Sequence, residues 1–364
     1  MSATMQPVSV LVTGGLGYLG SHTAVALAEA GFRVVIVDNL SNSSIEVLER
    51  IESVCAVSPA TYCGDVRDLT LMQTVLRRNP VQCAVHFAGL GAVAESARIP
   101  VDYYDVNVNG TMTLLRALEE VGVRRMVFSS SAAVYGDRGA DPLHEDGGTA
   151  PISAFGRSKR AAEDLLADAC GADARWAIAT LRCFNPAGAH PGGNIGERRP
   201  GVPHHLLPYL AQVAEGERPA LRVFGNDYAT ADGTGVRDYV HVADVADAHV
   251  RAVQRLLSDR GGYAVVNIGS GTAHSVLDVV HAYERAHRVR VPCELAPRRP
   301  GDIASCLADT RRAEALLGWR AQRTLEDICR DVARFEALQR QRHQAAPLPR
   351  QMRERRAAEA LPLA

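Results

Sequence analysis

The stretch Val8-Ser9-Val10-Leu11-Val12-Thr13-Gly14-Gly15-Leu16-Gly17-Tyr18-Leu19-Gly20 decides the fold. Its first part, Val8 to Val12, is a short apolar run, which is typical of a buried parallel strand. An alanine-rich helix is expected next, over Ser21 to Ala30, and Gly31 ends it. The stretch therefore predicts a strand, a glycine-rich loop and a helix in immediate succession.

The loop in this stretch has three glycines at three-residue spacing. Gly14 permits a tight turn, Gly17 lets the backbone approach a pyrophosphate, and Gly20 lets the helix pack on the strand. The helix N-terminus then faces the phosphates with its partial positive charge. Asp38 ends the second apolar run, near the ~20-residue offset of an acid that binds ribose hydroxyls and repels a 2′-phosphate. The pattern favours NAD over NADP, and the alternative is a tight turn in a sheet protein that binds another ligand.

Apolar runs and helical stretches alternate along the first half of the chain. Further strands are expected over Arg33–Val37, Cys83–Phe87, Arg125–Ser129 and Ala177–Arg182, with helices over Val106–Val121 and Ser158–Ala169. Alternation of this kind indicates an α/β fold with a Rossmann-type, doubly wound parallel sheet. Right-handed crossovers bring the carboxyl ends of all the strands to one edge, where ligands bind. At this edge Asp65 is a candidate acceptor for an adenine amino group, or equally a turn or N-cap residue.

The pattern changes after Asn185-Pro186, where the chain becomes rich in glycine and proline. We expect a smaller, mixed α/β substrate domain to begin there. A helix over Tyr239–Val253 and a strand over Tyr263–Asn267 are predicted to return to the large sheet. The expected division is a dinucleotide-binding domain over 1–186 with returning segments near 236–270, a substrate domain mainly over 187–344, and a flexible tail over 345–364.

Composition excludes several classes of protein. The 364 residues are 47% hydrophobic and 22% charged, with a net charge of -1, so no positive field is present to hold nucleic acid or an anionic membrane. The eight cysteines include no CxxC pair, so neither a metal site nor a disulfide framework is expected. With no signal peptide and no apolar run of about 18 residues, the cytoplasm is the expected compartment. Among the 40 basic residues only Lys159 is a lysine, which indicates a role that arginine cannot fill.

Motifs along nearly the whole chain, from about Val8 to Arg334, carry a resemblance to a known family. They are VTGGLGYLGSHT, VDNLSNS, HFAGL, AVAES, YYDVNVNGT, FSSSAAVYGD, RCFNPAGAHP, FGNDYATADGTGVRDYVHV and PRRPGD. In these motifs the chain resembles the extended short-chain dehydrogenase/reductase family and, within it, the nucleotide-sugar epimerases. The resemblance implies NAD-dependent interconversion of UDP-glucose and UDP-galactose through a 4-keto intermediate, as part of galactose metabolism.

The resemblance also implies the catalytic groups. In the family a tyrosinate removes the proton of the sugar's 4-hydroxyl, a lysine four residues later lowers the pKa of that tyrosine, and a serine hydrogen-bonds the reacting oxygen. Ser131 matches the serine and Lys159 the lysine, but Phe155 stands at the tyrosine position. Because a phenyl ring neither donates nor accepts a proton, activity is expected to be weakened, typically by ~100- to 10,000-fold.

The cofactor and substrate contacts that the resemblance implies are broader. For NAD they are Gly14, Gly17, Tyr18, Leu19, Gly20, Asp38, Asn39, Ser41, Asn42, Ser43, Asp65, Val66, Phe87, Ala88, Gly89, Leu90, Lys159 and Phe184. For the UDP-sugar they are Ser131, Asn185, His205, Leu221, Val223, Phe224, Arg237, Tyr239, Arg299, Asp302 and Cys306. From the residues alone, Ser131 is also readable as a strand-end hydroxyl that bonds the backbone, Asn185 as a turn residue, and either arginine as a surface residue.

Several residues depart from the family pattern besides Phe155. Gly91 replaces a lysine, Val106 an asparagine, Cys183 a tyrosine, and His204-His205 an Asn-Asn pair. Cys306 replaces the tyrosine of family members that exclude N-acetylated sugars, so UDP-N-acetylhexosamines are expected as further ligands. The alternatives are a non-catalytic NAD- and UDP-sugar-binding paralogue, and a related epimerase or dehydratase. The residues after Ser131 supply no acid pair for a dehydratase. A homodimer is expected by resemblance, through the helices around 106–121 and 158–169.

Overall fold

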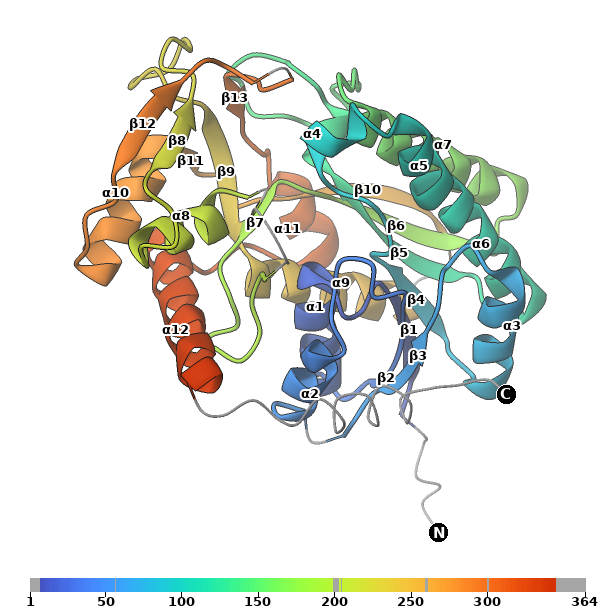
Figure 1. Ribbon diagram of the computed structural model, residues 1–364. Coiled ribbons are helices and arrows are strands. Elements are labelled where there is room, and N and C mark those ends of the chain that lie inside the picture. Colours follow the sequence, from blue (N-terminus) through green and yellow to red (C-terminus); the bar gives the residue numbers. More distant parts are fainter. Residues whose placement is uncertain are drawn as a thin grey trace.

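Seven parallel strands form the central sheet of the computed structural model, which describes residues 7–55, 57–198, 203, 205–258, 261–299 and 301–344. Their order is β10-β6-β5-β4-β1-β2-β3 (Figure 1). The strands are β1 (Ser9–Thr13), β2 (Arg33–Asp38), β3 (Ala60–Cys63), β4 (Cys83–His86), β5 (Arg125–Ser131), β6 (Ala177–Cys183) and β10 (Gly262–Ile268). The predicted α/β fold with a doubly wound parallel sheet is confirmed.

Helices cover both faces of this sheet (Figure 1). One face packs against α1 (Tyr18–Glu29), α9 (Val242–Ser258) and α11 (Arg311–Leu317), and the other against α3 (Leu69–Arg78), α6 (Gly110–Glu120) and α7 (Ala154–Ala172). In β1, Val10 and Val12 enter the first hydrophobic core and Leu11 enters the second. Since successive side chains of a strand point to opposite faces, a strand buried on both faces reads as a continuous apolar run.

A second, smaller group of strands lies beyond the carboxyl edge of the large sheet. Strand β9 (Val236–His241) pairs with β7 (Asn185–Ala187), β11 (Ala273–Ser275) and β13 (Ser305–Cys306), while β8 (Leu221–Phe224) pairs with β12 (Cys293–Ala296). Helices α8 (Leu206–Ala214), α10 (Val276–His287) and α12 (Leu325–Gln344) pack on this group around a third core. The chain then returns to the large sheet, because β10 pairs with β6 as predicted.

Two predicted elements differ from the structure. The helix expected over Tyr239–Val253 is wrong at its start, since Val236–His241 is strand β9 and helix α9 begins at Val242. The helix expected over Val106–Val121 begins as a π-helical turn, η1 (Asp105–Asn109), and continues as α6. The remaining short helices are α2 (Glu46–Glu52), α4 (Val93–Ser96) and α5 (Pro100–Tyr104), with a 3-10 turn η2 at Ala132–Val134. The tail predicted over 345–364 lies outside the described residues.

Three further findings concern the part of the chain that the structure describes. All eight cysteines lie within it, and each has a free thiol. No helix there is long and apolar enough to cross a lipid bilayer. The described histidines, cysteines and carboxylates form no cluster of three or more placed to hold a metal ion.

Candidate active site

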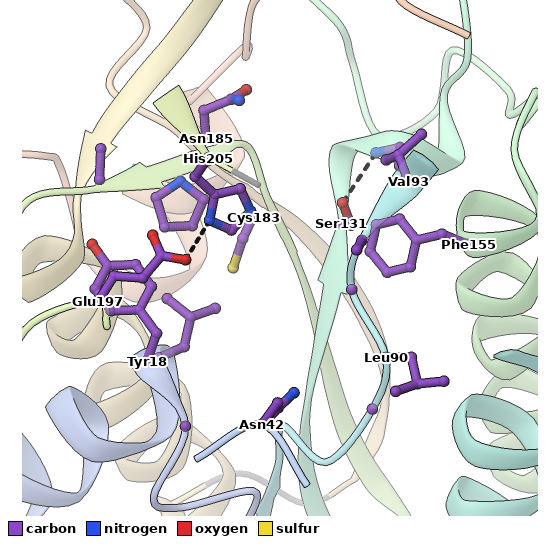
Figure 2. A pocket seen from close by; sticks show the side chains of 18 of the residues that line it. Tyr18, Asn42, Leu90, Val93, Ser131, Phe155, Cys183, Asn185, Glu197 and His205 are labelled. Carbon is purple, nitrogen blue, oxygen red and sulfur yellow. Dashed lines mark hydrogen bonds and ion pairs between the residues drawn. The ribbon is translucent and has the colours of Figure 1, made fainter. Parts of the chain in front are cut away.

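A cavity of about 1110 Å³ lies between the carboxyl edge of the large sheet and the smaller group of strands. Figure 2 shows Ser131, Phe155 and Val93 on one side of it, with Cys183, Asn185 and the pair Glu197 and His205 facing them. Every predicted site residue lines this cavity except Ser43 and Val223. Residues up to 292 positions apart in the sequence, from Gly14 to Cys306, therefore share one site.

The glycine-rich loop forms one end of the cavity. Its turn puts Gly14 at a φ of 69°, and the Gly14 amide donates to the Val37 carbonyl at 2.7 Å. At Gly20 an added Cβ would lie 2.1 Å from the Gly14 carbonyl oxygen, so helix α1 can start this close to the loop only with glycine there. The α1 N-terminus faces the cavity without a side-chain cap. A backbone cradle at a helix N-terminus is the arrangement that a dinucleotide's pyrophosphate requires, so these residues fit NAD.

Asp38 stands at the end of β2, beside this loop. Its carboxylate accepts hydrogen bonds from the Leu16 amide at 2.9 Å, the Leu40 amide at 2.9 Å and the Ser43 hydroxyl at 2.7 Å. Ser43 therefore orients Asp38 rather than lining the cavity. The three donors hold the carboxylate in one orientation at the cavity wall, the position that the sequence predicts for a ribose-binding acid.

Asp65 lies at the next strand end, after β3. Its carboxylate accepts from the amide and the guanidinium of Arg67 and from the Asn39 side chain. The Arg67 hydrogen bonds lower the pKa of Asp65 well below its usual range, so the group is ionised. The N-cap of α3 is Asp68, not Asp65. Of the three roles that the sequence left open for Asp65, the N-cap is wrong, while the turn and the adenine contact are both compatible with this geometry.

The first turn of α7 brings Phe155 to the strand end that carries Ser131. The helix begins at a Ser153 cap, whose hydroxyl accepts from the Gly156 amide at 3.0 Å. A Cβ at Gly156 would lie 2.4 Å from the Ala133 carbonyl oxygen, so glycine is needed for the helix to approach this closely. The Ser131 hydroxyl accepts from the Ala133 amide at 3.2 Å, which leaves its own proton to donate into the cavity.

Lys159 lies one helical turn after Phe155 and also lines the cavity. Its side chain is 7% exposed, and its Nζ donates to the Ser129 carbonyl at 2.9 Å. The ammonium group lies 4.8 Å from the centre of the Phe128 ring. Burial lowers the pKa of Lys159 to about 8. The structure thus places the chain's single lysine at the site, in surroundings that disfavour its charge.

A buried ion pair lies behind these residues, and sequence reasoning missed it. Arg182 of β6 donates to Glu163 of α7, with 2.7 Å between Nη2 and Oε2, and the Ser130 hydroxyl donates to Glu163 at 2.6 Å. Both charged side chains are at most 2% exposed. The pair ties α7 to strands β5 and β6, so it orients the helix that carries Phe155 and Lys159. Glu163 falls four residues after Lys159, and this helical spacing is the one available signal.

The opposite wall carries the predicted nucleotide-sugar residues. Arg237 donates to the Val236 carbonyl at 2.8 Å, and Arg299 pairs with Asp302 at 2.8 Å while its guanidinium covers the Phe224 ring at 4.6 Å. The remaining predicted residues on this wall are Asn185, His205, Leu221, Tyr239 and Cys306. Two guanidinium groups here suit a diphosphate, because each presents several donors in a fixed fork.

Differences from the predicted set are confined to a few positions. Val223 is 1% exposed and lies in the third hydrophobic core instead of facing the cavity. His205 does line the cavity, and its Nδ1 lies 2.6 Å from the Glu197 carboxylate (Figure 2). Sequence reasoning did not single out Glu197 or Tyr228, which also line the wall. Both are in glycine-rich segments where no local pattern distinguishes a site residue.

Comparison with known proteins gives consistent matches over this whole architecture. A family model described as GDP-mannose 4,6 dehydratase matches residues 11–332. The UDP-glucose 4-epimerase of Bacillus subtilis (strain 168) is 47% identical over 330 residues, which are 91% of this chain and 97% of that protein.

Among solved structures, the UDP-glucose 4-epimerase of Bifidobacterium longum in complex with NAD+ and UDP has a TM-score of 0.88 at 44% identity, over 91% of this chain and 98% of its own. The enzyme of Stenotrophomonas maltophila, with bound NAD and formylated UDP-arabinopyranose, has a TM-score of 0.89 at 46% identity, over 93% and 100%.

Proposed function

The chain belongs to the UDP-glucose 4-epimerase family, within the extended short-chain dehydrogenases/reductases, and from this we propose that it interconverts UDP-glucose and UDP-galactose. The observation that carries the proposal is the single cavity that brings the glycine-rich loop, Ser131, Lys159 and the two arginines together. It is an NAD-dependent isomerase that binds UDP-sugars. The reaction belongs to galactose metabolism.

NAD is held, in this proposal, by the loop at Gly14, Gly17 and Gly20, by Asp38 and by Lys159. When bound, the nicotinamide supplies reversible oxidation of the sugar's carbon 4. Arg237 and Arg299 neutralise the diphosphate of the UDP-sugar, and Asn185, which lines the same cavity (Figure 2), contacts the UDP-sugar. Asp302 orients Arg299 through their ion pair and remains the proposed acceptor for a ribose hydroxyl.

Phe155 is expected to slow the removal of the substrate's proton. The Ser131 hydroxyl can donate to the reacting oxygen, but Phe155, which is 8% exposed at the cavity wall, has no group that accepts the proton. Losing a general base costs about 100- to 10,000-fold in rate. We therefore propose slow turnover combined with ordinary binding of NAD and UDP-sugar.

The Phe155 side chain also favours a second candidate function. A protein that binds NAD and UDP-sugar without catalysis needs the glycine loop and the arginines, and it does not need a proton acceptor. The residues Ser131-Ala132-Ala133 supply no acid beside the serine, so the structure gives no comparable support to a dehydratase.

Incubating the purified protein with UDP-galactose and measuring UDP-glucose separates the two candidates. Slow formation of UDP-glucose that stops in a Ser131→Ala variant supports the epimerase. Stoichiometric binding of NAD and UDP-galactose with no product at any protein concentration supports the binding protein.

Three finer properties are part of the proposal. The side chain of Cys306 is smaller than tyrosine and lines the cavity, which leaves room for the acetamido group of UDP-N-acetylhexosamines. Exposed apolar side chains on α5, namely Val101 and Tyr104, support a homodimer through the neighbouring helices. The cytoplasm is the proposed compartment, because eight free thiols suit reducing conditions.

A further inference from the structure

The surroundings of the Lys159 amine are unusual for a buried cation. Its hydrogen bond goes to a neutral backbone carbonyl, that of Ser129, and its other close neighbour is the face of Phe128. Within the described ranges no carboxylate forms an ion pair with it. A buried ammonium without a counter-ion is costly, and this cost lowers the pKa of the amine.

The titratable groups that face Lys159 come from three elements. Glu163 is on the same helix, but its carboxylate is engaged by Arg182 and Ser130. Cys183 on β6 is a neutral thiol, because burial raises its pKa to about 12. His86 on β4 is a neutral imidazole, because burial lowers its pKa to about 3. The charge of Glu163 raises the pKa of Lys159 from a distance, but burial has the larger effect and lowers it.

Phe155 removes one more possible partner of the cation. The family's tyrosinate would be an anion on the same helix, one turn away, and a phenyl ring cannot ionise. Tyr103, the nearest aromatic neighbour of Phe155, directs its hydroxyl to Ala92 and to Glu95. The wall formed by Phe155, Ser131 and Lys159 thus holds one group that can become a base near neutral pH, and that group is an amine.

We propose that the ε-amino group of Lys159 is the terminal proton acceptor in this chain, receiving the proton of the sugar's 4-hydroxyl through a water molecule beside Phe155. This inference rests on the proposed epimerase function and deepens it. The role differs from that of a lysine that lowers the pKa of a neighbouring tyrosine, since here the nitrogen itself gains the proton.

The step balances without any further reactant. The O–H bond of the 4-hydroxyl breaks, its electron pair forms the carbonyl bond, and the electron pair of the C4–H bond goes to the NAD that the reaction already uses. Water receives the hydroxyl proton and passes one of its own protons to the nitrogen lone pair, so the amine becomes an ammonium ion. In the return half-reaction the ammonium gives the proton back, and the enzyme ends unchanged.

The pKa of Lys159 supports its role as the proton acceptor. Burial lowers the pKa of Lys159 to about 8, the range in which a general base is both available and strong enough near neutral pH. Serine and water lie far from this range.

The chain offers a direct measurement, because it contains a single lysine. Protein grown with [ε-13C]lysine and carrying no lysine in its tag gives one signal, whose chemical shift against pH reports the titration of Lys159 in the NAD-bound protein. We expect a midpoint near pH 8. A midpoint at the ordinary lysine value of about 10.4 overturns the inference.

A matched control comes from the same helix. Arg160→Lys adds a second lysine at a position whose side chain is 37% exposed and paired with Asp164. Its signal should titrate at an ordinary value in the same sample, beside the shifted signal of Lys159. Two signals that titrate together overturn the inference.

The rate of epimerisation should follow the ionisation of Lys159. Epimerisation should rise about tenfold per pH unit below pH 8 and level off above it. A rate that rises without a plateau identifies hydroxide as the base, and a rate independent of pH excludes an amine. Both results overturn the inference.

The Phe155→Tyr variant distinguishes failure of the inference about Lys159 from failure of the proposed function. If the variant epimerises and the wild-type rate does not follow the Lys159 titration, the inference is wrong and the function stands. If neither protein forms product at any pH while both hold NAD, the proposed function and the inference fail together.

Discussion

The Phe155 ring meets the Tyr103 ring edge-on, with 6.3 Å between ring centres and 77° between ring planes. Tyr103 is fully buried, and its hydroxyl contacts the Ala92 backbone and the Glu95 carboxylate rather than the cavity. The contact holds the phenyl ring at the cavity wall while the nearest phenol stays engaged elsewhere. A tyrosine at position 155 would therefore enter a slot that is already formed.

Phe155→Tyr is expected to raise turnover of UDP-galactose by at least tenfold. The substitution adds one oxygen at a wall that already carries Ser131 and Lys159, and it supplies an acceptor for the substrate's proton. UDP affinity, measured by calorimetry, should stay within a factor of two as a control for the intact site. Ordinary enzyme rates in the wild type together with no gain in the variant would mean that the family's mechanism does not transfer to this chain.

Gly20→Ala is expected to lower the NAD content of the purified protein at least tenfold. The new Cβ would lie 2.1 Å from the Gly14 carbonyl oxygen, so the loop and the start of α1 must separate. Nucleotide released by denaturation measures the loss, and in the wild type it should be NAD rather than NADP. Gly91→Ala is the matched control, because a Cβ there meets nothing within 4 Å although Gly91 also lines the cavity. Equal losses of NAD from the two variants would mean that the close contact at Gly20 is not what holds the cofactor.

Cys306→Tyr tests the breadth of substrates. Cys306 is 7% exposed and lines the cavity, so a phenol there would occupy part of the space proposed for the sugar. We expect the wild type to bind UDP-N-acetylglucosamine within tenfold of UDP-glucose. The variant should lose affinity for the acetylated ligand alone. Equal weakening of both ligands in a competition assay would show that this position is not a gate.

Val101→Glu is expected to convert a dimer into a monomer. Val101 is 77% exposed on α5, which lies beside α7 on the outside of the molecule (Figure 1), and Tyr104 on the same helix is 40% exposed. Light scattering at micromolar protein measures the mass. Val57→Glu is the control, since Val57 is equally apolar and 72% exposed but lies after α2. A monomeric wild type would contradict the proposed homodimer.

Stability is expected to fall in acid because of buried histidines. Burial lowers the pKa of His22 to about 3, of His86 to about 3 and of His249 to about 4. An unfolded histidine titrates near 6.5, so the stabilisation by the neutral rings is complete above that pH and is lost as the pH falls toward the folded values. In that window each buried histidine lowers the free energy of unfolding by about 1.4 kcal/mol per pH unit.

Denaturant melts between pH 8 and pH 4 check this slope. His249→Gln should flatten the slope by one histidine's share, because the His249 ring is fully buried and its Nε2 has no hydrogen-bond partner among the described residues. His281→Gln, at an exposed position, should leave the slope unchanged. Identical slopes in all three proteins would attribute the acid sensitivity to carboxylates.

Local pattern predicted the parts of this molecule that depend on local chemistry. The strand at Val10–Val12 reads as a continuous apolar run because both of its faces are buried, and the glycines of the loop recur because each meets backbone. The start of α9 was missed because Tyr239, Val240 and His241 run into the helix without a proline or glycine. These three residues pair with β7, and the first half of β9 pairs with β11 and β13; all three partner strands are distant in the sequence.

The polar interior could not be predicted in the same way. Arg182 and Glu163 are 19 residues apart on different elements, and Ser130 is 33 residues from Glu163. The one local signal is the position of Glu163 four residues after Lys159, and it does not show that the three side chains meet. The alternation of β8 explains Val223, since the residue before it, Arg222, is exposed and Val223 turns to the core.

The return of the chain to the large sheet at β10 has an evolutionary consequence. Because β10 pairs with β6 after the chain has passed through β7, β8 and β9, the sugar-binding half is not a contiguous cassette that recombination could exchange in one piece. New ligand preferences must then arise by substitution in place, one wall residue at a time. The residues that line the cavity, from Gly14 to Cys306, are spread along the chain in the same way.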